Sequence, residues 1–189
     1  MSFIKITHPK EGVALVTLNR PDRMNAMAFD VMQPLKEELE TISFRSDIRL
    51  VILTGEGSTF CAGADLQDPG YLPVFDGHTM PRIALRAMRV LDDVMMTIRE
   101  MTQPVIAAIN GPAVGGGFCL AMAADLRIAS ESAFFRAAGI NNGLTSAELG
   151  LSYLLPRTIG ITRANDIMLT GRDVGAQEAE RFGIVSRVC

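Results

Sequence analysis

The spacing of apolar residues along the chain switches repeatedly between the period of a strand and the period of a helix. Segments in which apolar residues alternate with polar ones, or run on without a break, predict strands. They cover residues 3–6, 13–18, 50–53, 104–109, 126–129, 133–135 and 184–185. The short continuous runs 50–53 and 104–109 are typical of strands that are buried on both faces.

Helices are predicted between these strands, where apolar residues recur three and four positions apart. They cover residues 28–44, 81–101, 118–124, 145–156, 162–169 and 176–182. Pro34 lies inside the first of them, which indicates a late start or a kink. The segment 68–80 is rich in proline and glycine, has no period and is expected to be a mobile surface loop. The alternation predicts one α/β domain over residues 1–189, with mostly parallel strands.

Composition narrows the function classes. The chain has 189 residues, is 48% hydrophobic and carries a net charge of −3 with no evident Lys/Arg cluster, so we expect a packed core and no nucleic-acid partner. No stretch approaches the roughly 18–20 apolar residues of a membrane helix. An odd number of cysteines without CxxC spacing favours reduced thiols in the cytoplasm, and with only two distant histidines we expect no metal site.

Two glycine-bearing turns are the candidate functional features. Residues 60–66 (FCAGADL) follow one buried strand, and residues 110–117 (NGPAVGGG) lie between another and a helix. Both are at the carboxyl ends of strands, where open α/β sheets place ligands. Nucleotide-binding glycine motifs are absent from the sequence, so two backbone N–H groups that form an oxyanion hole are the better hypothesis. The simpler alternative is that glycine serves only the geometry of each turn.

The order of several motifs resembles the crotonase superfamily, the enoyl-CoA hydratase/isomerase family, along nearly the whole chain. The two glycine-bearing turns and their preceding strands match its two signatures. The other matching segments are 16–21 (VTLNRP) with Asn25 and Ala26, 124–129 (ADLRIA), 169–172 (LTGR) and 176–179 (AQEA).

The resemblance implies a spiral of ββα turns that binds an acyl-CoA thioester, with CoA as part of the substrate and no separate cofactor. It implies that the amides of Ala62 and Gly116 bind the thioester oxygen, where negative charge develops. Gly63, Ala64 and Asp65 are then expected to contact the substrate, although Asp65 is explained more simply as a residue that ties down its own loop.

The chain departs from the hydratase pattern at both catalytic glutamates. The matching positions are Cys119, which we interpret as a packing residue, and Gly139. Glu148 lies nearby, eight residues before Pro156, as in Δ3,Δ2-enoyl-CoA isomerases, whose double-bond shift needs a single base. Glu148 is therefore the predicted catalytic base. The alternative is a capping box with Thr145 at the start of a helix.

Two further functions stay open: a hydratase or other lyase that uses an unidentified acid, and a non-catalytic acyl-CoA-binding protein. Arg20 and Arg23 could meet CoA phosphates, but solvated loop charges are the favoured interpretation. The resemblance also implies C-terminal helices that are missing from this chain. A homotrimer or hexamer is expected, because the spiral core exposes apolar surface that subunits cover.

Overall fold

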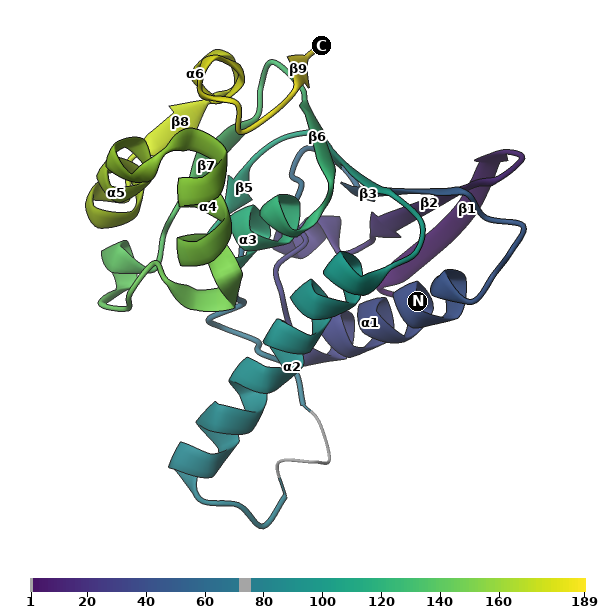
Figure 1. Ribbon diagram of the computed structural model, residues 1–189. Helices are drawn as coiled ribbons and strands as arrows, with labels where there is room; N and C mark the ends of the chain where they lie inside the picture. The colour runs from purple at the N-terminus through teal and green to yellow at the C-terminus, as the bar shows by residue number, and fades with distance from the viewer. Residues whose placement is uncertain (1, 72–75) are drawn as a thin grey trace.

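The computed structural model describes residues 2–71 and 76–189 and places most strands in one six-stranded sheet, ordered β1-β2-β3-β4-β6-β9 (Figure 1). These strands are β1 (Ile4–Lys10), β2 (Val13–Leu18), β3 (Leu50–Gly55), β4 (Val105–Ile109), β6 (Leu126–Ala129) and β9 (Arg187–Val188). Strands β1 and β2 form an antiparallel hairpin, and every other neighbouring pair in this sheet is parallel. The predicted α/β class with mostly parallel pairing is confirmed.

A second, smaller sheet of order β5-β7-β8 lies beside the first. Its strands are β5 (Ala113–Val114), β7 (Phe134–Arg136) and β8 (Asp173–Gly175). Two isolated parallel bridges, Cys61 to Ala113 and Met27 to Ala64, extend the same pairing into the loops. A long strand, a short strand and a helix thus follow one another, as β4, β5 and α3 do, and this is the ββα repeat that the resemblance implies.

The described residues form six α-helices that pack against the sheets. They are α1 (Phe29–Ser43), α2 (Met80–Glu100), α3 (Gly116–Ala123), α4 (Leu151–Ile159), α5 (Ile161–Thr170) and α6 (Ala176–Phe182). Helix α3 is buried from Gly117 to Ala123 at the centre of the molecule, which suits its strongly apolar sequence. Helices α4, α5 and α6 gather around the smaller sheet, and the N-terminal half of α2 extends away from the body (Figure 1).

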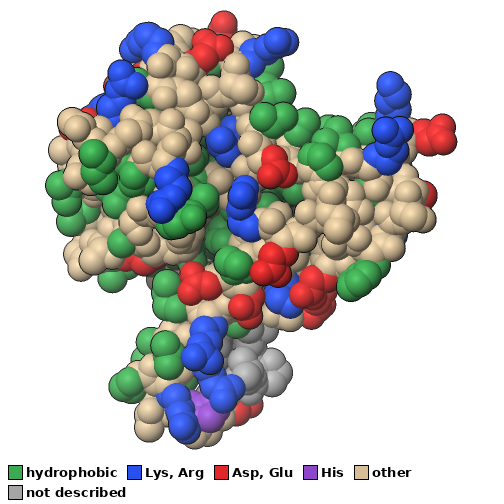
Figure 2. Space-filling model, viewed as in Figure 1, with side chains coloured by type: hydrophobic (Ala, Val, Ile, Leu, Met, Phe, Trp, Pro, Cys, Tyr) green, Lys and Arg blue, Asp and Glu red, His purple; other side chains and the backbone are tan. Residues whose placement is uncertain are grey.

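Basic side chains gather on the projecting half of α2, as Figure 2 shows at the lower end of the molecule. Arg82, Arg86 and Arg89 share one side of this helix because they are four and three residues apart. The expectation that the chain has no Lys/Arg cluster is therefore wrong at this place. The residues of α2 that are fully packed, Val94, Met95 and Ile98, all lie in its other half.

Three sequence-based expectations differ from the structure, and part of a fourth lies outside the described residues. Strands β3 and β4 are fully buried on one face and half-buried on the other. Helix α1 begins at Phe29 and continues through Pro34, without a late start. The last strand is β9 rather than residues 184–185, whose apolar side chains pack in the core instead of marking a strand. Of the loop predicted over 68–80, residues 72–75 lie outside the described residues.

The helix predicted over 145–156 is wrong in its first part. Residues Glu148–Gly150 form a separate 3-10 turn, η4, and α4 begins only at Leu151. The break is at Leu149, which has a left-handed backbone with φ of +53°. A leucine in this region is strained, and the strain is offset here because the side chain is buried.

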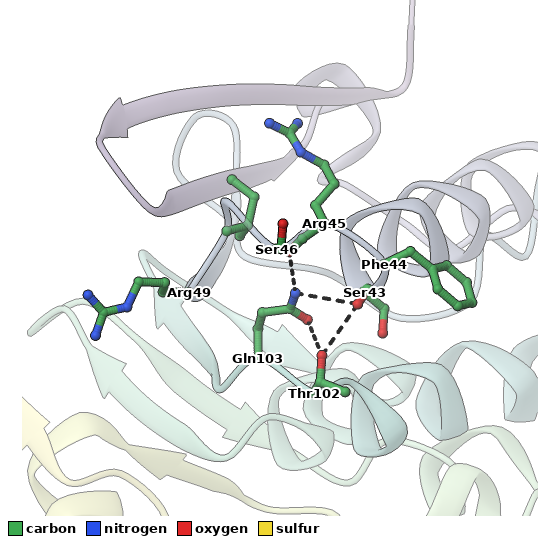
Figure 3. Close-up of a pocket in the computed structure, with 8 residues that line it drawn as sticks. Ser43, Phe44, Arg45, Ser46, Arg49, Thr102 and Gln103 are labelled. Atoms are coloured by element: carbon green, nitrogen blue, oxygen red, sulfur yellow. Dashed lines mark hydrogen bonds between the residues drawn. The ribbon is translucent and has the colours of Figure 1, made fainter.

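An open cavity of about 510 Å³ lies at the amino ends of strands β3 and β4, between the end of α1 and the start of β4 (Figure 3). The Gln103 side chain spans it and donates hydrogen bonds to the carbonyls of Ile42 and Arg45, both at 3.1 Å. The glycine-bearing turns follow the carboxyl ends of the same strands, so they lie at the opposite end of these strands from this cavity.

In the described part of the chain, no helix has the length and apolar character needed to cross a bilayer.

Candidate functional site

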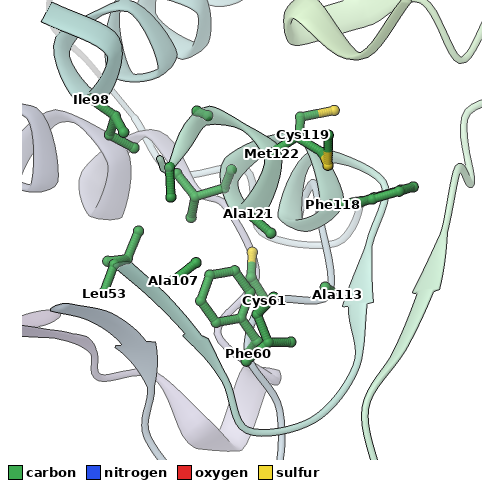
Figure 4. Packing of buried hydrophobic residues seen from close by; sticks show 14 of the residues in the cluster. Leu53, Phe60, Cys61, Ile98, Ala107, Ala113, Phe118, Cys119, Ala121 and Met122 are labelled. Atoms are coloured by element: carbon green, nitrogen blue, oxygen red, sulfur yellow. The ribbon is translucent and has the colours of Figure 1, made fainter. Parts of the chain in front are cut away.

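The two glycine-bearing turns lie directly against each other. The Cys61 amide donates to the Pro112 carbonyl at 3.1 Å, and the Val114 amide donates back to the Cys61 carbonyl at 3.0 Å. Figure 4 shows Cys61 and Ala113 next to each other below helix α3. Glycine is required at this contact, because a Cβ on Gly63 would lie 2.6 Å from the Val114 oxygen, and the φ of Gly63 is +86°. The two turns therefore meet, as an oxyanion hole shared between them requires.

Two residues at this junction, Ala64 and Gly116, line the same cavity and have backbone amides available to a ligand. Met27 exchanges hydrogen bonds with the Gly63 carbonyl and the Asp65 amide, so the intervening Ala64 amide points away from Met27. Gly116 is the first residue of α3, where the N–H groups of a helix lack internal partners. Among the described residues, neither the Ala64 amide nor the Gly116 amide has a hydrogen-bond acceptor.

The predicted role of the Ala62 amide is contradicted. The Ala62 N–H donates to the Met24 carbonyl at 3.1 Å, so it is not available to a ligand. The left-handed backbone of Gly63 turns the chain between Ala62 and Ala64, and the amide that becomes available is that of Ala64. A sequence pattern does not reveal this turn. The other predicted donor, Gly116, has its nitrogen 3.3 Å from the position that a Gly63 Cβ would take, so the two turns are in close contact at this point.

These residues line a cavity of about 240 Å³ with a mostly apolar wall. Met27, Leu66, Met88, Leu91, Leu144, Leu149 and Leu151 supply its apolar side chains. Ala62, Gly63, Ala64, Gly116 and Glu148, all predicted from the sequence, line it as well. Among the described residues of the wall, Glu148 is the one carboxylate. The cavity therefore combines a flexible apolar surface, two available amide donors and one acid.

The carboxylate of Glu148 is held in place through one of its two oxygens. The Thr145 hydroxyl donates to Glu148 Oε1 at 2.8 Å, and Glu148 Oε2 lies 3.3 Å from the position that a Cβ on Gly139 would take. The Cys119 thiol lies 3.7 Å from the Glu148 carbonyl. The alternative interpretation, a capping box, is wrong, because α4 begins at Leu151 and Thr145 bonds the carboxylate itself instead of capping the helix.

Asp65 is a structural anchor, and its side chain is not part of the cavity wall. Its carboxylate accepts hydrogen bonds from Arg20 at 2.9 Å and from Arg23 at 2.6 and 3.1 Å. The amides of Gln67 and Asp68 bond the same carboxylate. The hydrogen bonds from Arg23 hold the pKa of Asp65 far below its ordinary range. The expectation that Asp65 contacts the substrate is therefore wrong, and the alternative that it ties down its loop is confirmed.

Arg20 is not the solvated loop charge that we expected, whereas Arg23 stays partly exposed while it pairs with Asp65. The Arg20 side chain is only 7% exposed and pairs with both Asp65 and Asp68. Because Asp65 directly follows Ala64, this ion-pair cluster fixes the backbone that carries the Ala64 amide. Its partners are about 45 residues apart in the sequence, so a local pattern cannot indicate the pairing.

The two buried thiols are unreactive groups. Burial raises the pKa of both Cys61 and Cys119 to about 12, so neither forms an appreciable thiolate near neutral pH. This agrees with the interpretation of Cys119 as a packing residue. In the described part of the chain, no group of three or more His, Cys, Asp or Glu side chains converges as a metal site requires.

A thiol titration checks this assignment. At about pH 8 a disulfide reagent should label one thiol per native chain, the exposed Cys189, and all three cysteines after denaturation. The Cys189→Ser variant is the matched control and should show no fast labelling. Rapid labelling of Cys119 in the native protein would contradict its assignment as a protonated packing group.

Comparison with known proteins agrees with this geometry. Residues 8–189 match the family model described as "Enoyl-CoA hydratase/isomerase". The "Probable enoyl-CoA hydratase EchA12" of Mycobacterium tuberculosis is 60% identical over 187 residues, which are 99% of this chain and 66% of that protein. The chain thus spans just under two thirds of this relative's length.

Solved structures give the same result. A structure titled "probable enoyl-CoA hydratase/isomerase" from Mycobacterium abscessus is 61% identical with a TM-score of 0.93, covering 99% of this chain and 69% of that one. A "monofunctional enoyl CoA isomerase" from M. smegmatis is 53% identical with a TM-score of 0.82, covering 100% of this chain and 77% of that one. The chain belongs to the enoyl-CoA hydratase/isomerase family of the crotonase superfamily.

Proposed function

We propose that the protein shifts the double bond of an enoyl-CoA thioester from the 3 to the 2 position. The Ala64 and Gly116 amides bind the thioester carbonyl oxygen, and Glu148 moves the proton. One observation carries this proposal: two amides without acceptors among the described residues face a cavity in which Glu148 is the one described carboxylate. CoA takes part as a portion of the substrate.

The chemistry requires only these groups. Glu148 takes a proton from carbon 2, and the electron pair moves into the carbonyl to form a dienolate. The same proton is then returned to carbon 4, which leaves the double bond conjugated with the thioester. The negative charge develops on the carbonyl oxygen, where each preorganised donor is worth roughly 3–4 kcal/mol of barrier. No step uses a second acid or a bound water.

The cavity wall suits an acyl chain. Methionine and leucine side chains from α2 and from residues 144–151 provide an adaptable apolar surface, with Met27 beside Gly116. The relative from M. smegmatis that is titled an enoyl-CoA isomerase, at 53% identity, supports the same reaction class.

Hydration is the second candidate, because several relatives of this chain are named enoyl-CoA hydratases. Addition of water uses two carboxylates in the hydratases that the sequence resembles, and this chain has Cys119 and Gly139 at those positions. A longer side chain does not fit at residue 139 without a backbone shift, because a Cβ there would overlap the Thr145 carbonyl. The geometry therefore favours isomerisation.

An ultraviolet assay distinguishes the two reactions. With a 3-enoyl-CoA the protein should produce the absorbance of the conjugated thioester, and with a 2-enoyl-CoA it should leave that absorbance unchanged. Rapid loss of the conjugated absorbance would support a hydratase instead. Tight binding of an acyl-CoA without either change would contradict both reactions.

A further inference from the structure

The Thr145 hydroxyl contacts the proposed base directly, and the one-base reaction gives it no role. It donates to Glu148 Oε1 at 2.8 Å and accepts a weaker bond from the Ala147 amide at 3.4 Å. Thr145 itself is exposed, so its hydroxyl is not needed to fill the core. A hydroxyl aimed at a carboxylate next to an apolar cavity constrains that carboxylate.

We propose that Thr145 is a positioning residue, which holds one oxygen of Glu148 so that the other is presented to the substrate. This inference rests on the proposed function of Glu148. Because Oε1 is engaged by Thr145, Oε2 is the oxygen that exchanges the proton. Oε2 has no hydrogen-bond partner among the described residues, and it lies toward Gly139, which lines the same cavity.

The backbone around Glu148 is already fixed, which leaves the side chain as the element to be oriented. Ser146 is buried; its hydroxyl donates to the Ala137 carbonyl at 2.9 Å and accepts from the Ile140 amide at 3.3 Å. On the other side, Leu149 is buried, and its Cδ1 lies 3.4 Å from the position that a Cβ on Gly116 would take. A glutamate with three rotatable bonds on a fixed turn still samples several rotamers.

Gly139 provides the space for this arrangement. A Cβ at position 139 would approach Glu148 Oε2 to 3.3 Å and would overlap the Thr145 carbonyl. The absence of a side chain therefore lets Glu148 reach across the space that a residue at position 139 would otherwise occupy. Thr145 fixes the carboxylate in that space, because it bonds the oxygen on the other side.

Kinetics of three variants test the proposal. Thr145→Val, which keeps the shape and removes the hydroxyl, should lower kcat for a 3-enoyl-CoA about tenfold and leave KM within about twofold, as expected for one lost hydrogen bond to a charged group. Thr145→Ser should restore kcat to within about twofold of the native enzyme. Thr170→Val is the matched control. Like the Thr145 hydroxyl, the Thr170 hydroxyl accepts a hydrogen bond from the amide two residues later, that of Arg172, but Thr170 lies outside the cavity wall.

The outcomes separate this inference from the function on which it rests. If Glu148→Gln abolishes turnover and Thr145→Val keeps full kcat, the positioning role is wrong and the base assignment stands. If Glu148→Gln keeps its turnover, the proposed function itself fails. Equal loss in the Ser and Val variants, or a rise in KM alone, would also overturn the positioning role. If the Val variant is unstable, Thr145→Ala carries the same test, with Ser as the rescue.

Discussion

The Glu148→Gln variant should lose about 10³-fold in kcat for isomerisation of a 3-enoyl-CoA, in the middle of the range for a positioned acid–base group. The proposed reaction has one proton carrier, and among the described residues of the cavity wall no second carboxylate is present to replace it. The substituted amide keeps the size of the side chain and an acceptor for the Thr145 hydroxyl, so the turn should stay folded. Steady-state kinetics with the ultraviolet assay measures the effect.

The unfolding free energy of this variant should stay within about 1 kcal/mol of the native value, because Glu148 is only half-buried. Glu131→Gln makes the same chemical change on an exposed turn and should leave kcat unchanged. If the Glu148 variant retains native turnover, the carboxylate is not the base. Loss of activity together with loss of the folded state would indicate a structural role instead.

Gly63→Ala should lower kcat/KM about 100-fold, the effect of removing one oxyanion donor. Its Cβ would lie 2.6 Å from the Val114 oxygen and 3.3 Å from the Gly116 nitrogen, so the two turns must separate. The amides of Ala64 and Gly116 would then no longer meet at one oxygen. The positive φ of residue 63 adds a stability loss of about 1–3 kcal/mol.

Gly183→Ala separates these two effects. Gly183 has the same φ of +86°, but a Cβ there has only an ordinary contact at 4.0 Å. Urea unfolding should show a loss of stability in both variants, whereas kcat/KM should fall only in Gly63→Ala. If the two variants keep equal activity, close contact of the turns is not needed for the reaction.

The elements that the sequence predicted well are those with a continuous periodic pattern. Helices α2, α5 and α6 begin and end within one or two residues of their predicted bounds, because apolar spacing and glycine caps act locally. The two glycine-bearing turns are also predictable, since glycine directly after a buried strand, once at Gly63 and as a run at Gly115–Gly117, is typical of a tight turn with close backbone contacts. These turns locate most of the candidate site.

The remaining features depend on contacts that a local pattern does not contain. The apolar spacing of residues 145–156 is the same whether or not Leu149 is left-handed, so the separate turn that carries Glu148 was not predicted. The direction of the Ala62 amide depends on Met24, nearly 40 residues earlier in the chain. The pairing of Arg20 with Asp65 likewise joins residues that are far apart in the sequence, and it depends on how two loops pack against each other.

The position of Glu148 gives a physical reason why residue 139 is a glycine in this chain. The carboxylate reaches into the space next to Gly139, so a second acid at that position would compete with it for the same volume. Cys119 contacts the Glu148 carbonyl with a thiol that stays protonated, which supports the turn and adds no charge. The departures from the hydratase pattern thus form one arrangement around the proposed base, Glu148.

A crystal structure with a bound, non-isomerisable acyl-CoA would show whether the two amides and Glu148 act on one thioester. We expect the thioester oxygen to lie about 2.7–3.1 Å from both the Ala64 and the Gly116 nitrogens. We also expect Glu148 Oε2 to be the carboxylate oxygen nearest to carbons 2 and 4 of the acyl chain. A thioester oxygen that contacts neither amide, or an acyl chain whose reacting carbons lie far from Glu148, would contradict the proposed mechanism.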